Sequence, residues 1–182
     1  MATNRKMASM VSDVIVTHNT DEYTKLFDKW TLYAHLPHDT DWSLDSYKVI
    51  STIDSIEQSI AIYQNLPDKM VQNCMLFLMR KDITPIWEDS NNRNGGSFSY
   101  KVSNKEVPRA WRNLSYRIMG ESVSENNKLL AKVNGCTISP KKNFCIIKIW
   151  ISDCTIQNVR EIVDIAGLDK QGVIFKRHNP EY

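Results

Sequence analysis

Apolar and polar residues alternate along several short stretches of the chain, and this period of two is typical of half-buried β-strands. Examples are "KWTLYAHL" and "SFSYKV", which contain the aromatic and β-branched residues that strands favour. The continuous apolar run "CMLFLMRK" predicts a buried central strand. "NGCTIS" and "FCIIKIWI" flank the basic turn "PKKN", which predicts a β-hairpin. The predicted strands cover residues 29–36, 45–52, 74–81, 97–102, 134–139, 144–151 and 172–177.

Other stretches carry apolar residues at helical spacing and have helix-ending signals. Asp54 and Glu57 resemble a capping box. Pro108 suits a first helical turn, and Gly120 and Gly167 suit helix ends. The predicted helices cover residues 54–65, 108–120 and 155–167. Hairpin strands interrupted by a few helices indicate an α+β fold with a mostly antiparallel sheet, helices on one face and loops on the other.

The composition suits one globular domain. The chain has 182 residues, long enough to bury a substantial core. We expect residues 1–19 to form a short flexible tail and residues 20–182 a single domain. The formal net charge is only +2, so any contact with nucleic acid must come from a local cluster of basic residues. No apolar stretch is long enough to span a membrane, and no signal-peptide core is present, so we expect a cytoplasmic protein that does not contact membranes.

The sequence gives little support to a metal or cofactor site. Its four cysteines form no C-x-x-C pair and lie mostly among apolar neighbours, which favours buried reduced thiols. His35 and His38 have the spacing of metal ligands, but no further ligand set accompanies them. We expect these histidines to be polar surface residues near a ligand.

Two of the five tryptophans lie in predicted loops. Trp42 lies in a polar segment between two strands, and Trp87 opens the loop "WEDSNNRNGG". Loops run over the surface, so these rings are candidates for ligand contact, whereas Trp30 and Trp111 lie in periodic segments and are expected in the core. An alternative that the pattern supports equally is that each loop tryptophan closes one end of the sheet.

Glu88, directly after Trp87, adds a chemical clue. A carboxylate accepts two hydrogen bonds side by side, and guanine offers two adjacent donors, N1–H and the N2 amino group. Stacking on an aromatic ring is worth about 1–3 kcal/mol per base. A guanine methylated at N7 is cationic and gains a cation–π term of up to about 2 kcal/mol. Tryptophans on two loops and a glutamate therefore suit a methylated guanine better than a neutral one.

These motifs resemble the eukaryotic translation initiation factor 4E family, which binds the 5′ cap of messenger RNA. "PIWED" followed by "NNRNGGSF" resembles its signature loop, "DKWTLYAH" its opening strand and "TDWSL" its first cap-stacking loop. "SIEQSIAIYQNL" and "RAWRNLSYRIMGE" resemble its first two helices, and "IIKIW" resembles a strand ending in another pocket tryptophan. The resemblance covers residues 26–178 and indicates a divergent member. It implies a curved sheet with about three long helices on the convex face and cap-binding loops on the concave face.

The resemblance also implies roles for individual residues. Trp42 and Trp87 would sandwich the N7-methylguanine, and Glu88 would accept hydrogen bonds from its Watson–Crick edge. Trp150 would touch the N7-methyl group. Lys141 stands where the family has an arginine that grips the cap phosphates.

The phosphate ligands of the family are only partly present. Ser97 and Ile146 stand where the family has basic residues. Lys148 has the strand parity of Trp150, so it can face the same side and compensate. With Lys142, neighbour of Lys141, as a second candidate, the expected phosphate ligands are Lys141, Lys142 and Lys148.

The partner-binding helix of the family is altered as well. Ile56 and Ile60 stand where the family presents apolar residues to a helical peptide of the scaffold factor 4G or of inhibitory binding proteins. They are one helical turn apart and could form an apolar strip for such a helix. The alternative, which the spacing alone favours, is that they form the core side of their helix. Arg112 and Tyr116 replace family leucines, so the partner is either the scaffold factor or a divergent substitute.

The resemblance predicts cap recognition that promotes translation initiation. A repressor that occupies caps without recruiting the scaffold is a second reading, and a relative whose pocket no longer binds is another. A cap-hydrolysing enzyme would need a Mg²⁺-binding acid cluster or a nucleophile motif, and neither is found beyond "WED". We therefore expect binding without catalytic residues.

Overall fold

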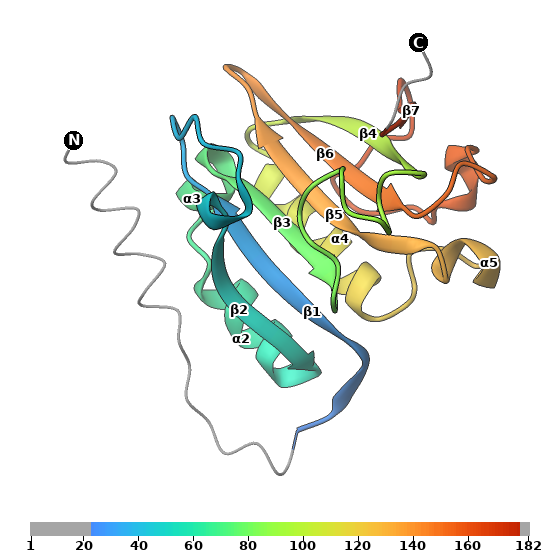
Figure 1. The fold of residues 1–182 in the computed structure, drawn as a ribbon, viewed down its shortest axis with the longest axis horizontal. Helices are drawn as coiled ribbons and strands as arrows, with labels where there is room; N and C mark the ends of the chain where they lie inside the picture. The colour runs from blue at the N-terminus through green and yellow to red at the C-terminus, as the bar shows by residue number, and fades with distance from the viewer. Residues whose placement is uncertain (1–22, 179–182) are drawn as a thin grey trace.

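A single antiparallel sheet organises the part of the chain that the computed structural model describes, residues 23–178 (Figure 1). The tail expected over residues 1–19 lies outside this range. The strand order is β2-β1-β3-β5-β6-β4-β7, and all neighbouring pairs are antiparallel. The strands are β1 Lys25–His35, β2 Lys48–Ser55, β3 Met75–Arg80, β4 Gly96–Ser103, β5 Val133–Pro140, β6 Phe144–Ile151 and β7 Ile174–Arg177.

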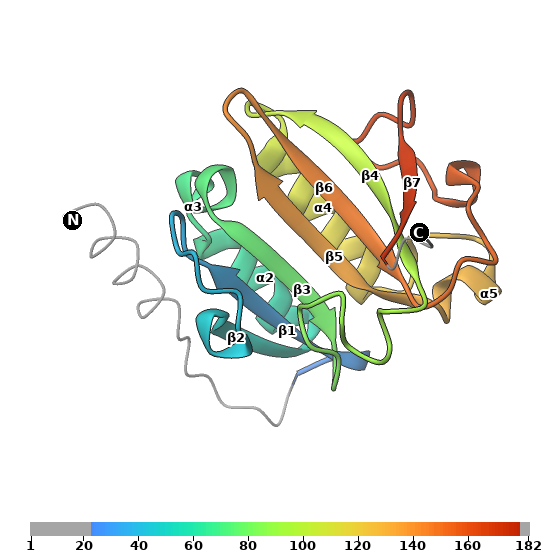
Figure 2. The same cartoon turned by 45° about the horizontal axis from the view of Figure 1, so that its top comes forward.

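Two longer helices, α2 Ile56–Asn65 and α4 Val107–Met119, pack across one face of the sheet (Figures 1 and 2). The short helices are α3 Asp68–Asn73 and α5 Asn127–Leu130, and neither was predicted. None of the helices in residues 23–178 is both long and apolar enough to cross a bilayer. The α+β prediction, with helices on one face and loops on the other, is confirmed.

Side-chain alternation along the strands divides the apolar residues between two cores. Leu76 and Leu78 of β3 join the large core beneath the helices, which also contains Trp30 and Trp111 as predicted. Phe77 of the same strand points to the opposite face, where it belongs to a small second core. We call this second side, which α2 and α4 leave uncovered, the open face. Cys74, Cys136 and Cys145 are buried thiols, and burial raises the pKa of Cys74 to about 11.

The first predicted helix forms, but it is capped one residue later than expected. Ser55, not Asp54, is the N-cap, and its Oγ accepts a hydrogen bond from the Gln58 N–H at 3.3 Å. The Gln58 side chain in turn accepts from the Asp54 N–H at 3.0 Å. Gln58 therefore bonds both to the cap residue and to the residue before it, which is a variant of the capping box in which the side-chain bond reaches one residue further back.

The helix predicted over residues 155–167 is wrong. Only a single 3-10 turn, Val159–Glu161, forms there, and the Asn158 side chain caps it. Val163 then donates its N–H to the Val123 carbonyl instead of to a residue one turn back. The apolar residues of this segment still pack against the large core, from a mostly irregular backbone. The described chain therefore has two long helices instead of about three.

Candidate functional site

The register of the sheet lines up residues of neighbouring strands in rows across the open face. One row, from β3 to β7, consists of Met79, Gly135, Trp150, Ser97 and Lys176. The adjacent row consists of Phe77, Thr137, Lys148, Ser99 and Ile174. The apolar side chains of Phe77 and Met79 thus lie at the β3 end of these rows, and the lysines lie on β6 and β7, where Trp150 is also found.

Trp42 is held at the edge of the open face by a stack of rings. Its indole is 55% exposed, and it lies parallel to the His35 imidazole, with ring centroids 4.1 Å apart and planes at 6°. His35 also meets Tyr47 edge-on at 5.3 Å, and Tyr47 meets Phe77 edge-on at 5.2 Å. The expectation that His35 is a surface residue is wrong, because only 2% of it is exposed. One face of Trp42 is therefore backed by protein.

His35 is itself fixed by a hydrogen bond, since its Nε2 lies 2.8 Å from the Asp41 carbonyl oxygen. A carbonyl oxygen only accepts, so Nε2 must carry the proton in this contact. Asp41 is the residue before Trp42, and this contact ties the loop to the strand end that carries His35. Residues 23–178 contain no cluster of three side chains suited to a metal ion.

The loop that carries Trp87 is closed by its own polar side chains. The Asp89 carboxylate accepts hydrogen bonds from the Thr84 and Asn91 backbone N–H groups at 2.9 and 2.8 Å. Although burial alone would raise its pKa, these and further hydrogen bonds from the Thr84 and Asn91 side chains lower it. The second acid of "WED" is thus a loop-closing residue.

Asn92 lies at the centre of this loop and is fully buried. Its side-chain amide donates to the carbonyl oxygens of Thr84 and Ile86, at 3.1 and 2.8 Å. Its Oδ1 accepts from the Asn134 amide at 2.9 Å. Asn134 lies at an irregularity in the β5 register between Val133 and Gly135, and such bulges re-aim a side chain.

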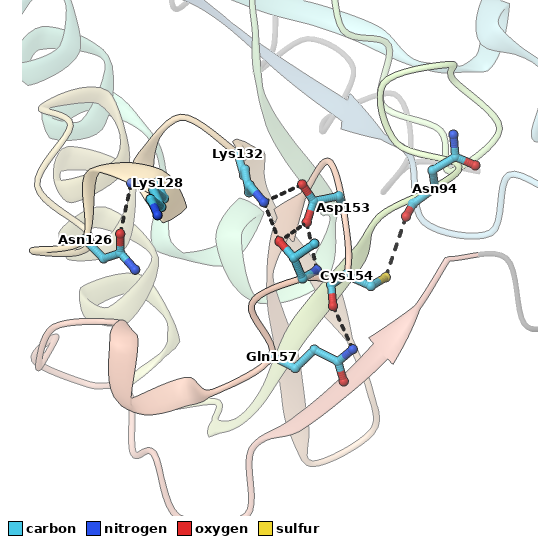
Figure 3. Close-up of polar contacts among 8 residues, drawn as sticks. Asn94, Asn126, Lys128, Lys132, Asp153, Cys154 and Gln157 are labelled. Carbon is cyan, nitrogen blue, oxygen red and sulfur yellow. Dashed lines mark hydrogen bonds and ion pairs between the residues drawn. The ribbon is translucent and has the colours of Figure 1, made fainter.

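The far end of the loop is pressed against the end of β6. A Cβ on Gly95 would lie 1.8 Å from the Ile151 carbonyl oxygen, so only glycine fits there. The Cys154 thiol lies 3.6 Å from the Asn94 carbonyl oxygen, as Figure 3 shows. The segment that carries Cys154 is anchored by Asp153, which pairs with Lys132 at 2.6 Å. The backbone around Trp87 and Glu88 is therefore held from several sides.

Trp87 and Glu88 themselves face solvent. Trp87 is 45% exposed, and Glu88 is exposed as well. Within residues 23–178 the Glu88 carboxylate has no hydrogen-bond or ion-pair partner. Burial, and secondarily the Glu88 charge, raises the pKa of Tyr47. Glu88 therefore lies within electrostatic range of Tyr47, the ring that also contacts His35.

Trp150 belongs to the second core and is mostly buried. Its indole N–H donates to the Thr137 hydroxyl at 3.2 Å, which fixes the ring on the open face. The His178 ring lies against it at 4.4 Å, tilted by 53°. His178 Nδ1 lies 2.8 Å from the Asn92 carbonyl oxygen. Burial lowers the pKa of His178, and so does the Lys148 charge, although the hydrogen bond to Asn92 acts in the opposite direction. This histidine joins the Trp87 loop to Trp150.

The lysines on this face form a positive cluster. Burial is the first cause that lowers the pKa of Lys148, and the charges of Lys176 and Lys141 lower it further. Of the predicted phosphate ligands, Lys141 and Lys148 are thus within electrostatic range of each other. Lys142 lines a different hollow, with Lys101 and Phe144.

The sequence interpretation missed Lys176, His178 and the stacking role of His35. Lys176 lies directly across from Ser97 in the β4–β7 register, and Ser97 is a position where the resemblance leads one to expect a basic residue. Strand parity within "GVIFKR" could not reveal this neighbour, because the pairing of β7 with β4 joins residues far apart in sequence.

The predicted partner surface lies on the outer side of the helices. Ile56 and Ile60 are 42% and 41% exposed, whereas Ile62 of the same helix is buried. The reading that these isoleucines form the core side is therefore wrong. Arg112 is exposed, and the half-buried Tyr116 meets Tyr63 of α2 edge-on at 5.3 Å.

The fold and site together define a class of protein: a single antiparallel sheet backed by helices, with rings, one unpaired carboxylate and lysines gathered on the open face. Residues 25–180 match the family model for eukaryotic initiation factor 4E. The chain belongs to the eukaryotic initiation factor 4E family, as the motifs predicted.

Individual relatives agree with this assignment. Eukaryotic translation initiation factor 4E of Eremothecium gossypii is 30% identical over 158 residues, which cover 83% of this chain and 69% of that protein. The Candida glabrata factor of the same name is 29% identical over 133 residues, which cover 69% of this chain and 62% of that protein. The match thus spans less than two thirds of the Candida protein.

A solved structure confirms the fold. The crystal structure of schistosome eIF4E complexed with m7GpppG and 4E-BP superposes with a TM-score of 0.66 at 20% identity. The superposition covers 74% of this chain and 75% of that one.

Proposed function

We propose that this protein binds the N7-methylguanosine 5′ cap of messenger RNA, without catalysis. The observation that carries the proposal is the adjacency of an exposed ring, Trp87, and an unpaired carboxylate, Glu88, on a loop that is held from several sides. The hydrogen bonds of Asp89 and of the buried Asn92 hold this loop in place before the ligand binds. Less conformational entropy is therefore lost on binding.

The base is bound between Trp42 and Trp87, and Glu88 accepts from N1–H and the N2 amino group. Stacking contributes about 1–3 kcal/mol per base, and the cationic methylated ring adds a cation–π term of up to about 2 kcal/mol. The free carboxylate of Glu88 complements the positive charge of that ring, which a neutral guanine lacks. Trp150 contacts the N7-methyl group, as the resemblance implies.

The phosphates are bound by Lys141, Lys148 and Lys176; the mutual charge effects of these lysines support this assignment. Lys142, which lines a neighbouring hollow, lies at the edge of this region. Mutual repulsion between these lysines is relieved when an anion binds among them, which favours a multiply charged triphosphate over a single phosphate. Phosphate binding is thus mainly electrostatic, and the affinity of the protein for the cap should fall as the salt concentration rises.

The biological role that fits this ligand is translation initiation in the cytoplasm, exercised by a single domain over residues 20–182. The schistosome relative was solved with both m7GpppG and 4E-BP. The exposed Ile56 and Ile60 offer an apolar strip of the kind that an amphipathic helix covers, which favours a partner of the 4G or binding-protein type. A repressor would use the same strip differently, or not use it, while keeping the cap site.

Tryptophan fluorescence tests the proposal directly. The protein is titrated with N7-methyl-GTP and, separately, with GTP. We expect strong quenching by the methylated nucleotide and at least tenfold weaker binding of GTP, since the cation–π term is lost. Equal affinity for both would indicate a general nucleotide site, and no response to either would refute cap binding.

A further inference from the structure

A hollow at the far end of the open face lies outside the cap site. It has a volume of about 510 Å³ and opens where β4 ends and the β5–β6 hairpin turns. The residues that line it are Lys101, Ser103, Lys142, Asn143 and Phe144. It thus combines two lysines with one aromatic ring and contains no acidic residue, the composition expected for a site that takes an aromatic group bearing negative charge.

The hollow is on the same face as the proposed phosphate cluster. Phe144 and Lys148 are both even-numbered residues of β6, and the odd-numbered Cys145, Ile147 and Ile149 point into the large core. At about 3.4 Å per residue, Phe144 lies roughly 14 Å along the strand from Lys148. The hollow therefore continues the basic surface away from Trp150 instead of forming a separate face.

Lys101 adds a positive charge on β4, beside a position of β6 that carries none. The β4–β6 register places Lys101 directly across from Ile146, which lies between Phe144 and Lys148 on the open face. Adjacent strands are about 4.8 Å apart, so Lys101 lies beside the uncharged gap between the hollow and Lys148. On the other side of β4, Lys176 lies across from the uncharged Ser97. The basic path is therefore wider than one strand and is directed towards the hollow.

Inside the hollow, ring and charge are already associated. Lys101 Nζ lies 4.6 Å from the centroid of the Phe144 ring. Phe144 is half-buried and belongs to neither core, so its ring is not needed to complete the packing of the sheet. An exposed ring with lysines beside it is the arrangement by which proteins bind single-stranded nucleic acid, the base on the ring and the phosphate on the cations.

We propose that the RNA chain immediately following the cap is bound in this hollow, with a base stacked on Phe144 and the adjoining phosphates paired with Lys101 and Lys142. The inference rests on the proposed cap-binding function. It assigns the protein a second contact with messenger RNA, which recognises stacking and charge and not base identity.

The test compares N7-methyl-GTP with a short capped RNA and with the same RNA lacking the N7-methyl group. We expect the capped RNA to bind the unmodified protein more tightly than N7-methyl-GTP does. Lys101→Ala and Phe144→Leu should leave the affinity for N7-methyl-GTP unchanged and lower the affinity for capped RNA, about tenfold for loss of one base stack. Leucine keeps an apolar side chain at position 144, and unchanged N7-methyl-GTP binding shows that each variant is folded.

The matched control is Lys128→Ala, which removes one positive charge from an exposed position on α5. It should have no effect on either ligand. If N7-methyl-GTP binds but the RNA extension adds no affinity, or if both variants keep the gain, the hollow has no role and cap binding stands. If N7-methyl-GTP does not bind the unmodified protein, the proposed function itself fails.

Discussion

The imidazole of His35 lies flat beneath the indole of Trp42, with centroids 4.1 Å apart and 6° between the planes. His35 is buried, while Trp42 is half exposed. The buried histidine therefore supports the inner face of the Trp42 indole. A nucleotide base stacked on the outer face of Trp42 would complete a three-ring stack.

Loss of this support should weaken cap binding without removing any group that touches the cap. His35→Ala should lower the affinity for N7-methyl-GTP roughly fivefold, because a stacked aromatic pair contributes about 1 kcal/mol. His35→Phe keeps a flat ring and should retain most of the affinity. Fluorescence titration measures the affinity of both variants for N7-methyl-GTP. An equal loss of affinity in both would mean that His35 acts through its hydrogen bond to Asp41 and not through stacking.

Glu88→Gln should reduce N7-methyl-GTP affinity by about tenfold to a hundredfold, since a hydrogen bond to a charged group contributes about 1.5–3 kcal/mol. Glutamine keeps the size of the side chain but places an amide donor against the donors of guanine. The exposed Glu125→Gln is a matched control for loss of one negative charge. Calorimetric affinity within twofold of the unmodified protein would exclude Glu88 from the site.

Lys148 should make cap binding dependent on pH in the alkaline range. Its pKa is lowered in the free protein by burial and by Lys176 and Lys141, and a bound phosphate favours the charged form and raises that pKa. Binding therefore takes up protons, and affinity should begin to fall with rising pH earlier than for a lysine of ordinary pKa. Calorimetry in buffers of different ionisation enthalpy measures the proton uptake.

Lys148→Met is the variant that isolates this effect. It should abolish the alkaline proton uptake and flatten the salt dependence of N7-methyl-GTP binding, because one phosphate contact is lost. Retention of the same proton uptake in the variant would assign the titration to another group.

Much of this arrangement could be predicted from local sequence, and what could not depends on distant strands. The Trp87 loop is recognisable because its glycines, Asn92 and the "WED" motif lie within one short segment. Lys101 and Lys176 could not be placed, because their relation to Ile146 and Ser97 exists only through the pairing of β4 with β6 and β7. A local pattern contains no information about such a register.

Two of the errors in interpreting the sequence pattern have the same physical origin. The apolar spacing of residues 155–167 suits a helix, but the segment instead pairs with a neighbouring loop, where Ser124 bridges Ile162. Ile56 and Ile60 have core-like spacing, yet the helix turns Ile62 and Tyr63 inward. In each case the apolar spacing fits two structures about equally well, and contacts with the rest of the fold determine which one forms.

Asn92→Ala should destabilise the protein and also weaken cap binding. The change leaves the Thr84 and Ile86 carbonyl oxygens without their buried donor, at a cost of about 1–3 kcal/mol. Urea denaturation measures the stability, and the exposed Asn73→Ala, whose side chain bonds only within α3, is the control. Full stability combined with full affinity would show that the loop does not depend on this network.

The exposed strip on α2 should bind a helical partner independently of the cap. Ile60→Glu places a charge at a position that is 41% exposed, so the fold should tolerate it, while an amphipathic helix seated on Ile56 and Ile60 should not. We expect at least a tenfold loss of affinity for a helical 4E-binding peptide, measured by fluorescence anisotropy, with N7-methyl-GTP binding unchanged.

Phe27→Glu is the matched control, because Phe27 is the most exposed large apolar side chain among residues 23–178, at 88%, and lies on β1 instead of α2. If Phe27→Glu no longer binds the peptide and Ile60→Glu still does, the partner surface is centred on β1. If neither variant responds because the unmodified protein does not bind the peptide, the altered helix face has lost this class of partner. A protein that then still bound caps would compete with initiation, because it would occupy the messenger RNA end without a means of recruiting the scaffold.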